Sequence, residues 1–242
     1  MPVPAALVPL AAVGLSFFVI ITCYFIAVAH GHVAPGLSNL PDITHCVLHL
    51  PARAVFLGLF IPAILLMALS WLLAASVLAP AGPALSLGWV AAGLGVCGCG
   101  LLLMGESVLD PEPNWTVHVL GASGFFLITM IAEALFAVAA GRVPAAGGRL
   151  SPRSIFAKRA VAGFNVFLVL LDVVLGASGW AKHHNTHLLE WILAFTVMGF
   201  HLSIAADLRG AKLTMVLPPP VAADAAAGLL TGSVVDASGG VQ

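Results

Sequence analysis

Charge is what this sequence has least of. Of its 242 residues, 9 are Lys or Arg and 10 are Asp or Glu, so charged residues make up 8% of the chain. A soluble domain of ordinary composition has about a quarter of its residues charged. This scarcity excludes an ordinary water-soluble domain, and the net charge of −1 gives no attraction to nucleic acid.

Motifs for common catalytic and nucleotide-binding sites are also missing. The sequence contains no G-x-S-x-G nucleophile elbow, no Walker motif and no H-E-x-x-H zinc motif. Its four cysteines lack the C-x-x-C spacing of structural zinc sites, and we interpret them as small apolar side chains. We therefore expect no cofactor and assign no catalytic residue, and we leave open whether the protein is an enzyme.

Long apolar runs dominate what is present, since 61% of the residues are hydrophobic. A helix that crosses the hydrocarbon core of a bilayer needs roughly 20 apolar residues. We predict an all-α polytopic membrane domain over residues 1–213, with six transmembrane helices in one bundle. Residues 214–242 are predicted to form a disordered tail. The expected helices cover residues 7–29, 54–78, 85–104, 117–140, 160–177 and 188–206.

The distribution of positive charge predicts the orientation of these helices. Six spans place both termini on one side, and seven of the nine basic residues lie on that side. The positive-inside rule then predicts that both termini, including the tail of residues 214–242, are cytoplasmic. Asn114-Trp115-Thr116, on the other side, forms a possible glycosylation sequon. The seven basic residues are Arg142, Arg149, Arg153, Lys158, Arg159, Arg209 and Lys212.

Four ionisable residues fall inside the expected spans, where they are costly and therefore candidates for function. They are Glu133, Asp172, Glu190 and His201. Glu133 and His201 lie about 10 Å and 7 Å from the inner ends of their helices, at 1.5 Å per residue. This similar depth predicts a hydrogen-bonded intramembrane pair.

The other two residues are expected nearer the outer membrane surface. Asp172 and Glu190 lie there with His118 and His187, so we predict a polar cluster of these four that opens outward. Histidine and carboxylate groups suit either a metal or an acid–base site for a lipid headgroup, and His183 and His187 have i,i+4 spacing. Alternatively, the four groups hydrogen-bond across helices and only fix the bundle.

Several short motifs resemble those of the Frag/DRAM/Sfk family of six-helix membrane proteins. Leu189-Glu190-Trp191, Phe200-His201 and Asp207 resemble the last helix of the branch that contains the post-GPI-attachment factor. Leu40-Pro41-Asp42-Ile43-Thr44 is similar to an element of that family's first outer loop, and Pro51-x-Arg53 follows where that branch has Pro-x-Arg.

The resemblance implies an integral protein of the endomembrane system, with the Golgi or ER as the expected compartment and the lysosome or plasma membrane as alternatives. It implies an accessory role in GPI-anchor or related lipid remodelling, with membrane lipids and GPI-anchored proteins as partners. Other branches imply an autophagy modulator, or a scaffold for a phosphoinositide kinase that binds a protein through loop 141–159. A metal-dependent lipid hydrolase or acyltransferase is the remaining alternative.

Overall fold

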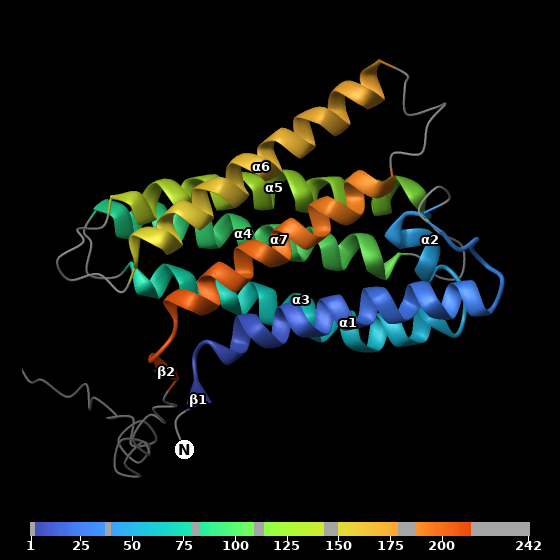
Figure 1. The fold of residues 1–242 in the computed structure, drawn as a ribbon, viewed down its shortest axis with the longest axis horizontal. Coiled ribbons are helices and arrows are strands. Elements are labelled where there is room, and N and C mark those ends of the chain that lie inside the picture. Colours follow the sequence, from blue (N-terminus) through green and yellow to red (C-terminus); the bar gives the residue numbers. More distant parts are fainter. Residues whose placement is uncertain are drawn as a thin grey trace, which may run out of the picture.

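The described residues form a bundle of helices in the computed structural model (Figure 1). The structure describes residues 3–36, 40–78, 83–108, 114–142, 150–178 and 187–213. The helices are α1 (Leu7–Ala29), α2 (Ile43–Val47), α3 (Ala52–Val77), α4 (Pro83–Ser107), α5 (Trp115–Gly141), α6 (Pro152–Ala177) and α7 (His187–Asp207). Two short strands, β1 (Val3–Pro4) and β2 (Lys212–Leu213), complete the described part.

Among the described residues, six helices, all except α2, are long and apolar enough to cross a membrane. This confirms the predicted all-α polytopic fold. Five of the six begin and end within about three residues of the predicted limits. The short helix α2 was not predicted; it begins after Asp42, whose carboxylate accepts a 2.6 Å hydrogen bond from the His45 backbone N–H.

The start of α6 differs from the prediction, which placed it at residue 160. The helix begins at Pro152, because the Ser151 hydroxyl accepts a hydrogen bond from the Ser154 N–H and proline suits the first helical position. Residues 152–159 are therefore helical and do not belong to the predicted loop 141–159. Hydropathy alone missed residues 152–159 of this helix because they include the charged side chains of Arg153, Lys158 and Arg159.

Strands β1 and β2 bring the two ends of the described domain together. They pair antiparallel, with Val3 opposite Leu213 and Pro4 opposite Lys212, and the Ala5 N–H also donates to the Ala211 carbonyl. We call this end of the bundle the inner end and the opposite end, which carries α2, the outer end (Figure 1). Both ends of the described domain thus lie on one side; that this side is cytoplasmic remains a prediction. The predicted tail 214–242 lies outside the described residues.

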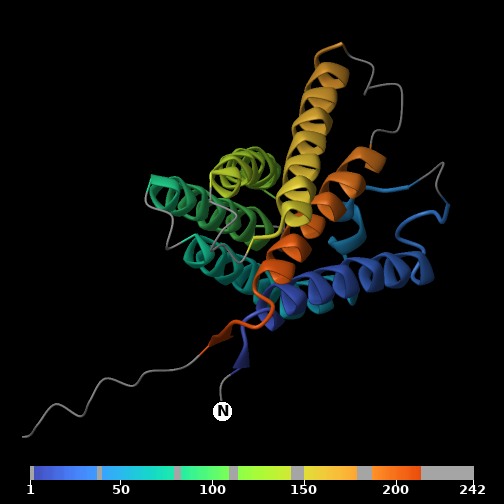
Figure 2. The ribbon, with the colours of Figure 1, turned by 60° about the vertical axis from the view of Figure 1, so that its left-hand side comes forward.

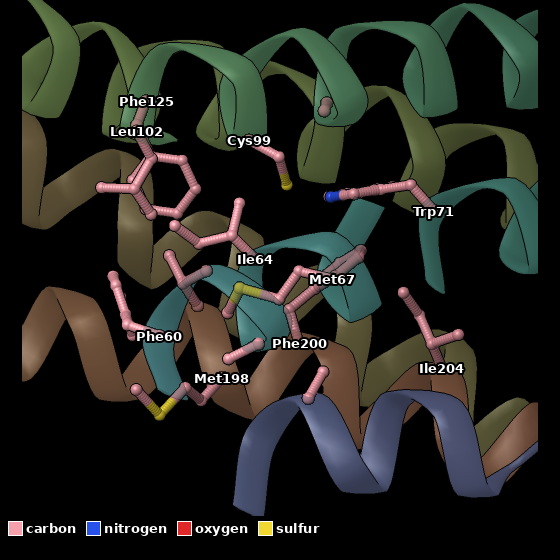
Figure 3. Close-up of a cluster of buried hydrophobic side chains, with 14 of the residues drawn as sticks. Phe60, Ile64, Met67, Trp71, Cys99, Leu102, Phe125, Met198, Phe200 and Ile204 are labelled. Carbon is pink, nitrogen blue, oxygen red and sulfur yellow. The ribbon is translucent and has the colours of Figure 1, made fainter. Parts of the chain in front are cut away.

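Helix α7 runs through the middle of the bundle, where it contacts α1, α3, α5 and α6. The most extensive helix pairs are α4 with α5 and α1 with α3 (Figure 2). Trp71 of α3 is fully buried in the hydrophobic core, with its indole pointing toward Cys99 of α4 (Figure 3). Its indole stacks on Phe200 at 5.5 Å between ring centroids and meets Phe136 edge-on at 6.3 Å.

Glycine sets the closest approach between α4 and α5. A Cβ atom at Gly121 would lie 2.6 Å from both the Gly105 Cα and the Leu101 carbonyl oxygen. Only a residue without a side chain permits this backbone contact, which is the usual packing device between helices in lipid.

A buried ion pair joins α6 to α7 near the inner end. The Lys158 Nζ lies 2.5 Å from Asp207 Oδ2, with both side chains almost fully buried. The Ser154 hydroxyl donates to Asp207 Oδ1 and accepts a 2.8 Å hydrogen bond from Lys158, which also donates to the Ser203 carbonyl. Asp207, one of the motif positions, therefore has a neighbour on α6 that holds it in place.

The outer half of α6 projects away from the other helices (Figures 1 and 2). Only 17% of its most apolar stretch is buried, and Val173 and Val174 each expose about 60% of their surface. In a membrane, these side chains contact lipid tails, so α6 leans on the bundle mainly through its first half.

Candidate functional site: a cavity at the outer end

A cavity of about 270 Å³ lies at the outer end, between α2, α5, α6 and α7. We call it the outer cavity. His118, Asp172, His187 and Glu190, the four residues of the predicted polar cluster, all line it. Asp42 and Thr44 add polar groups from the first outer connection. The apolar part of the wall consists of Trp115, Val119, Ala122, Phe126, Leu168, Leu189 and Leu193.

His118 is held in the cluster by a hydrogen bond at each ring nitrogen. Its side chain is buried, its Nδ1 lies 3.1 Å from the Gly105 carbonyl, and its Nε2 lies 2.9 Å from the Thr44 hydroxyl. In a neutral ring, Nδ1 donates to the carbonyl and Nε2 accepts the hydroxyl proton. His118 thus ties α5 to α2 and α4, as the structural alternative for the cluster expects.

Asp42, His187 and Glu190 form the part of the wall that could bind a cation. One donor atom from each lies within 4.8 Å of the others, and His187 Nδ1 is 3.7 Å from Asp42 Oδ2. One imidazole and two carboxylates suit a divalent ion such as Zn²⁺. Asp172 faces the same cavity from α6, whereas His183, the predicted i,i+4 partner of His187, lies outside the described residues.

A smaller apolar cavity of about 50 Å³ adjoins the outer cavity and extends toward the core. Thr44, Ala122, Phe126 and Glu190 line both cavities. Most of its wall is aliphatic or aromatic, from α1, α3, α4, α5 and α7. One carboxylate reaches it from α4: Glu106 is buried, and its Oε2 has no hydrogen-bond partner. The combined space is polar at its mouth and apolar inside.

The motifs of the first outer loop and the last helix meet beside this space. Trp191 Nε1 donates a 2.8 Å hydrogen bond to the Pro41 carbonyl oxygen, and Leu40 is buried in the core. Thr44 contacts His118, as described above, and Arg53 is buried in the first turn of α3. The loop motif is therefore a wall of the cavity and not a separate feature.

The predicted Glu133–His201 pair does not form. Glu133 accepts a 2.6 Å hydrogen bond from Asn165 Nδ2 of α6, while His201 Nδ1 bonds the Val197 carbonyl of its own helix. The His201 ring packs edge-on against Trp71 at 5.6 Å. Similar depth in the membrane does not decide which residues meet. The turn of each helix does, and it directs Glu133 to Asn165 and His201 to the Val197 carbonyl.

Asn114 is exposed and serves as the N-cap of α5, where its Oδ1 accepts a 3.2 Å hydrogen bond from the Val117 N–H. A glycan would be attached through Nδ2. Glycosylation at Asn114 stays a prediction.

The model of the Frag1/DRAM/Sfk1/Cwh43P N-terminal domain matches residues 4–211, which is almost the whole described part of the chain. The chain belongs to the Frag1/DRAM/Sfk1 family. No curated protein and no solved structure matches it. The family match confirms the family resemblance and an integral membrane protein; it does not assign the chain to the post-GPI-attachment branch.

Within this family member, sequence reasoning missed the two polar residues that the first outer connection adds to the cavity wall, Asp42 and Thr44. Each appeared only inside a motif, because residues of a loop carry no helical periodicity from which a face can be assigned. The signal was nevertheless present: Asp42 followed three residues later by His45 is an N-cap pattern. Recognising that cap would have placed Thr44 on a helix that faces the bundle.

Proposed function

We propose that this Frag1/DRAM/Sfk1 family protein binds a membrane lipid in the outer cavity and assists remodelling or handling of GPI anchors or related lipids. The observation that carries the proposal is the amphipathic character of the joined cavities. Polar groups of Asp42, His118, Asp172, His187 and Glu190 surround the mouth, and apolar side chains line the inner part. This arrangement matches a lipid, whose headgroup needs hydrogen bonds and whose chain needs apolar contact.

The charge of the mouth favours a particular kind of headgroup. The carboxyl groups of Asp42, Asp172 and Glu190 face the space, and two histidines accompany them. Carboxylates accept hydrogen bonds from hydroxyl and ammonium groups, whereas they repel a bare phosphate. A headgroup rich in hydroxyl and amine groups, as in a glycosylated inositol lipid, suits this wall.

Access from the membrane supports the same proposal. Asp172 and Leu168 line the cavity from α6, the helix whose outer half stands away from the bundle. A lipid can therefore approach sideways, from the hydrocarbon region, past a single helix.

The decisive experiment compares Glu190→Gln with Glu133→Gln in cells that lack the native protein. Both changes remove one carboxylate, but only Glu190 lines the cavity; Glu133 bonds Asn165 instead. At equal protein level, we expect Glu190→Gln to alter the lipid composition of GPI-anchored proteins, measured by mass spectrometry, and Glu133→Gln to leave it unchanged. Equal lipid profiles for the two variants would refute the proposal.

The donor set of Asp42, His187 and Glu190 favours a second candidate, a metal-dependent lipid hydrolase or acyltransferase. A bound Zn²⁺ would polarise an ester carbonyl or activate water there. Purified protein should then bind about one Zn²⁺ per chain, and His187→Ala should abolish this binding. Metal-free protein that restores the lipid profile of deficient cells would exclude this candidate.

The alternatives of a kinase scaffold or an autophagy modulator act through the inner end. Replacing the basic residues Arg153 and Arg209 by Gln would then impair function more than Glu190→Gln does. Location in the Golgi or the ER is part of the proposal. It is tested by co-localisation of the full chain with markers of these compartments.

A further inference from the structure

A groove of about 450 Å³ lies on the opposite end of the molecule from the outer cavity, between the last turns of α5 and the first half of α6. We call it the inner groove. Its floor and sides are alanine, glycine and valine from both helices, and Arg142 and Arg159 complete its lining. The groove shares no residue with either outer-end cavity.

The two arginines give the groove its charge. Both side chains are exposed, and no carboxylate is among the described residues that line the groove. Lys158, next to Arg159 in sequence, points elsewhere and is neutralised by Asp207. Arg142 and Arg159 are thus the charged groups of the lining, and both are positive.

Gly141 places one guanidinium group at the groove. A Cβ atom at this position would overlap Nη2 of Arg159, so the guanidinium lies directly against the Gly141 backbone. Arg142 follows immediately as the C-cap of α5. The end of α5 therefore carries one arginine and contacts the other, and both line the inner groove at the level where the α5 span ends.

The rest of the groove is open and apolar. Ala137 and Ala162 are buried at its base, whereas a Cβ atom at Gly163 would meet no atom within 4 Å. Small residues on both helices thus leave a channel, and it runs from the arginines into the part of α5 and α6 that spans the membrane.

We infer that the inner groove binds an anionic glycerophospholipid, with its phosphate on Arg142 and Arg159 and an acyl chain along the small residues of the floor. Guanidinium groups bind phosphate through paired, charge-assisted hydrogen bonds. The apolar floor lies within the span, where lipid chains are the surrounding solvent, and this favours a lipid over a soluble phosphate or a peptide. If the inner end is cytoplasmic, as predicted, it faces the leaflet in which anionic lipids are concentrated.

The test is a lipid titration of the full chain, purified in detergent, with bound phosphatidylserine counted by native mass spectrometry and phosphatidylcholine as the reference lipid. The variant Arg142→Gln/Arg159→Gln removes the charges, and Gly163→Leu places a side chain in the channel at a position where an added Cβ atom meets no atom within 4 Å. The control Arg153→Gln/Arg209→Gln removes two exposed arginines at the same end, outside the groove.

We expect each groove arginine to contribute about fivefold to phosphatidylserine affinity, so that the double variant loses its preference over phosphatidylcholine. Gly163→Leu should weaken both lipids, and the control pair should bind like the unmodified chain. Glycerol 3-phosphate should not compete, since it lacks the acyl chains. Equal loss in the groove and control variants would overturn the inference, because it would show attraction by general charge.

Two further outcomes would also overturn it. Competition by glycerol 3-phosphate would show a phosphate site without a lipid chain. A change from dimer to monomer in the Gly163→Leu variant, with lipid binding intact, would show that a second copy of the chain occupies the groove. Glu190→Gln, in the outer cavity, should leave phosphatidylserine binding unchanged, so this test is independent of the proposed function.

Discussion

The indole of Trp191 in α7 is hydrogen-bonded to the backbone carbonyl of Pro41, 150 residues earlier, at 2.8 Å. The ring is buried and also meets Tyr24 of α1 edge-on, at 6.0 Å between centroids. One side chain thus holds the first outer connection against the last helix, directly beside Glu190. This contact and the Thr44–His118 hydrogen bond together hold the segment that contains Asp42 and Thr44 in the cavity wall.

Replacing Trp191 by Phe should therefore destabilise the protein by about 1–3 kcal/mol, because the Pro41 carbonyl loses its buried donor. The measurement is thermal unfolding of the purified chain in detergent. Trp89→Phe is the matched control, since Trp89 is exposed on α4 and should change the midpoint little. Equal shifts in the two variants would show that the hydrogen bond contributes nothing.

The helices of this protein follow from its composition, whereas the contacts between them do not. Apolar runs of about 20 residues specify spans, and five of the six spans were predicted within a few residues. Partners across helices depend on which way each helix is turned, and no periodic polar face reports this in an apolar segment. Glu133 illustrates the limit: its depth was predicted, but its partner is Asn165.

The contact between α4 and α5 predicts opposite effects for two glycine-to-alanine changes. Gly121→Ala should destabilise the protein by about 1–3 kcal/mol, since its Cβ would overlap the Gly105 and Leu101 backbone. Gly93→Ala should be neutral or stabilising by up to about 1 kcal/mol, because no atom lies near its Cβ and alanine favours helix. Unfolding midpoints of both variants check the prediction; a shift of the same sign in both would contradict it.

The buried pair of Lys158 and Asp207 predicts strong coupling between two substitutions. Lys158→Met alone should cost about 3–5 kcal/mol, because it leaves the Asp207 carboxylate buried without its counter-ion. Adding Asp207→Leu should restore most of this loss. A double-mutant cycle of unfolding measures the coupling, with exposed Arg153→Gln as the control. Additive losses in the cycle would mean that the pair does not interact.

The thiol of Cys46, in α2, should resist alkylation. Burial, with smaller contributions from the Asp42 and Glu190 carboxylates, raises the pKa of the Cys46 thiol to about 12. The reactive thiolate is therefore scarce at neutral pH and remains a very small fraction of the thiol even at pH 9, which lies well below this pKa. The measurement is the iodoacetamide reaction rate of a chain in which Cys23, Cys97 and Cys99 are Ala; the same chain, denatured, should react with a normal thiol titration.

The predicted orientation can be checked with two single-cysteine chains. Arg209→Cys lies at the inner end and His32→Cys at the outer end, and both positions are exposed. In cells with a selectively permeabilised plasma membrane, an impermeant maleimide should label Arg209→Cys alone. Labelling of His32→Cys alone would place the termini on the opposite side of the membrane.

The four residues of the polar cluster were selected from sequence because charged groups are rare in apolar helices and depth can be counted in residues. The structure places all four, His118, Asp172, His187 and Glu190, in the wall of the outer cavity. Lys158 escaped the same reasoning because it belonged to a supposed basic loop. Its burial depends on the Ser151 cap and on Asp207 of a distant helix, neither of which hydropathy can report.

The pairing of Val3 with Leu213 has a topological consequence. A short linker between residues 3 and 213 would join the ends, and new termini could then be opened between Arg142 and Leu150. The permuted chain would begin with α6 and α7 and finish with α5, yet every helix would keep its direction through the bilayer, since both breaks lie on one side. The arrangement of the helices in the described domain should therefore be the same whichever of these inner-end connections carries the termini.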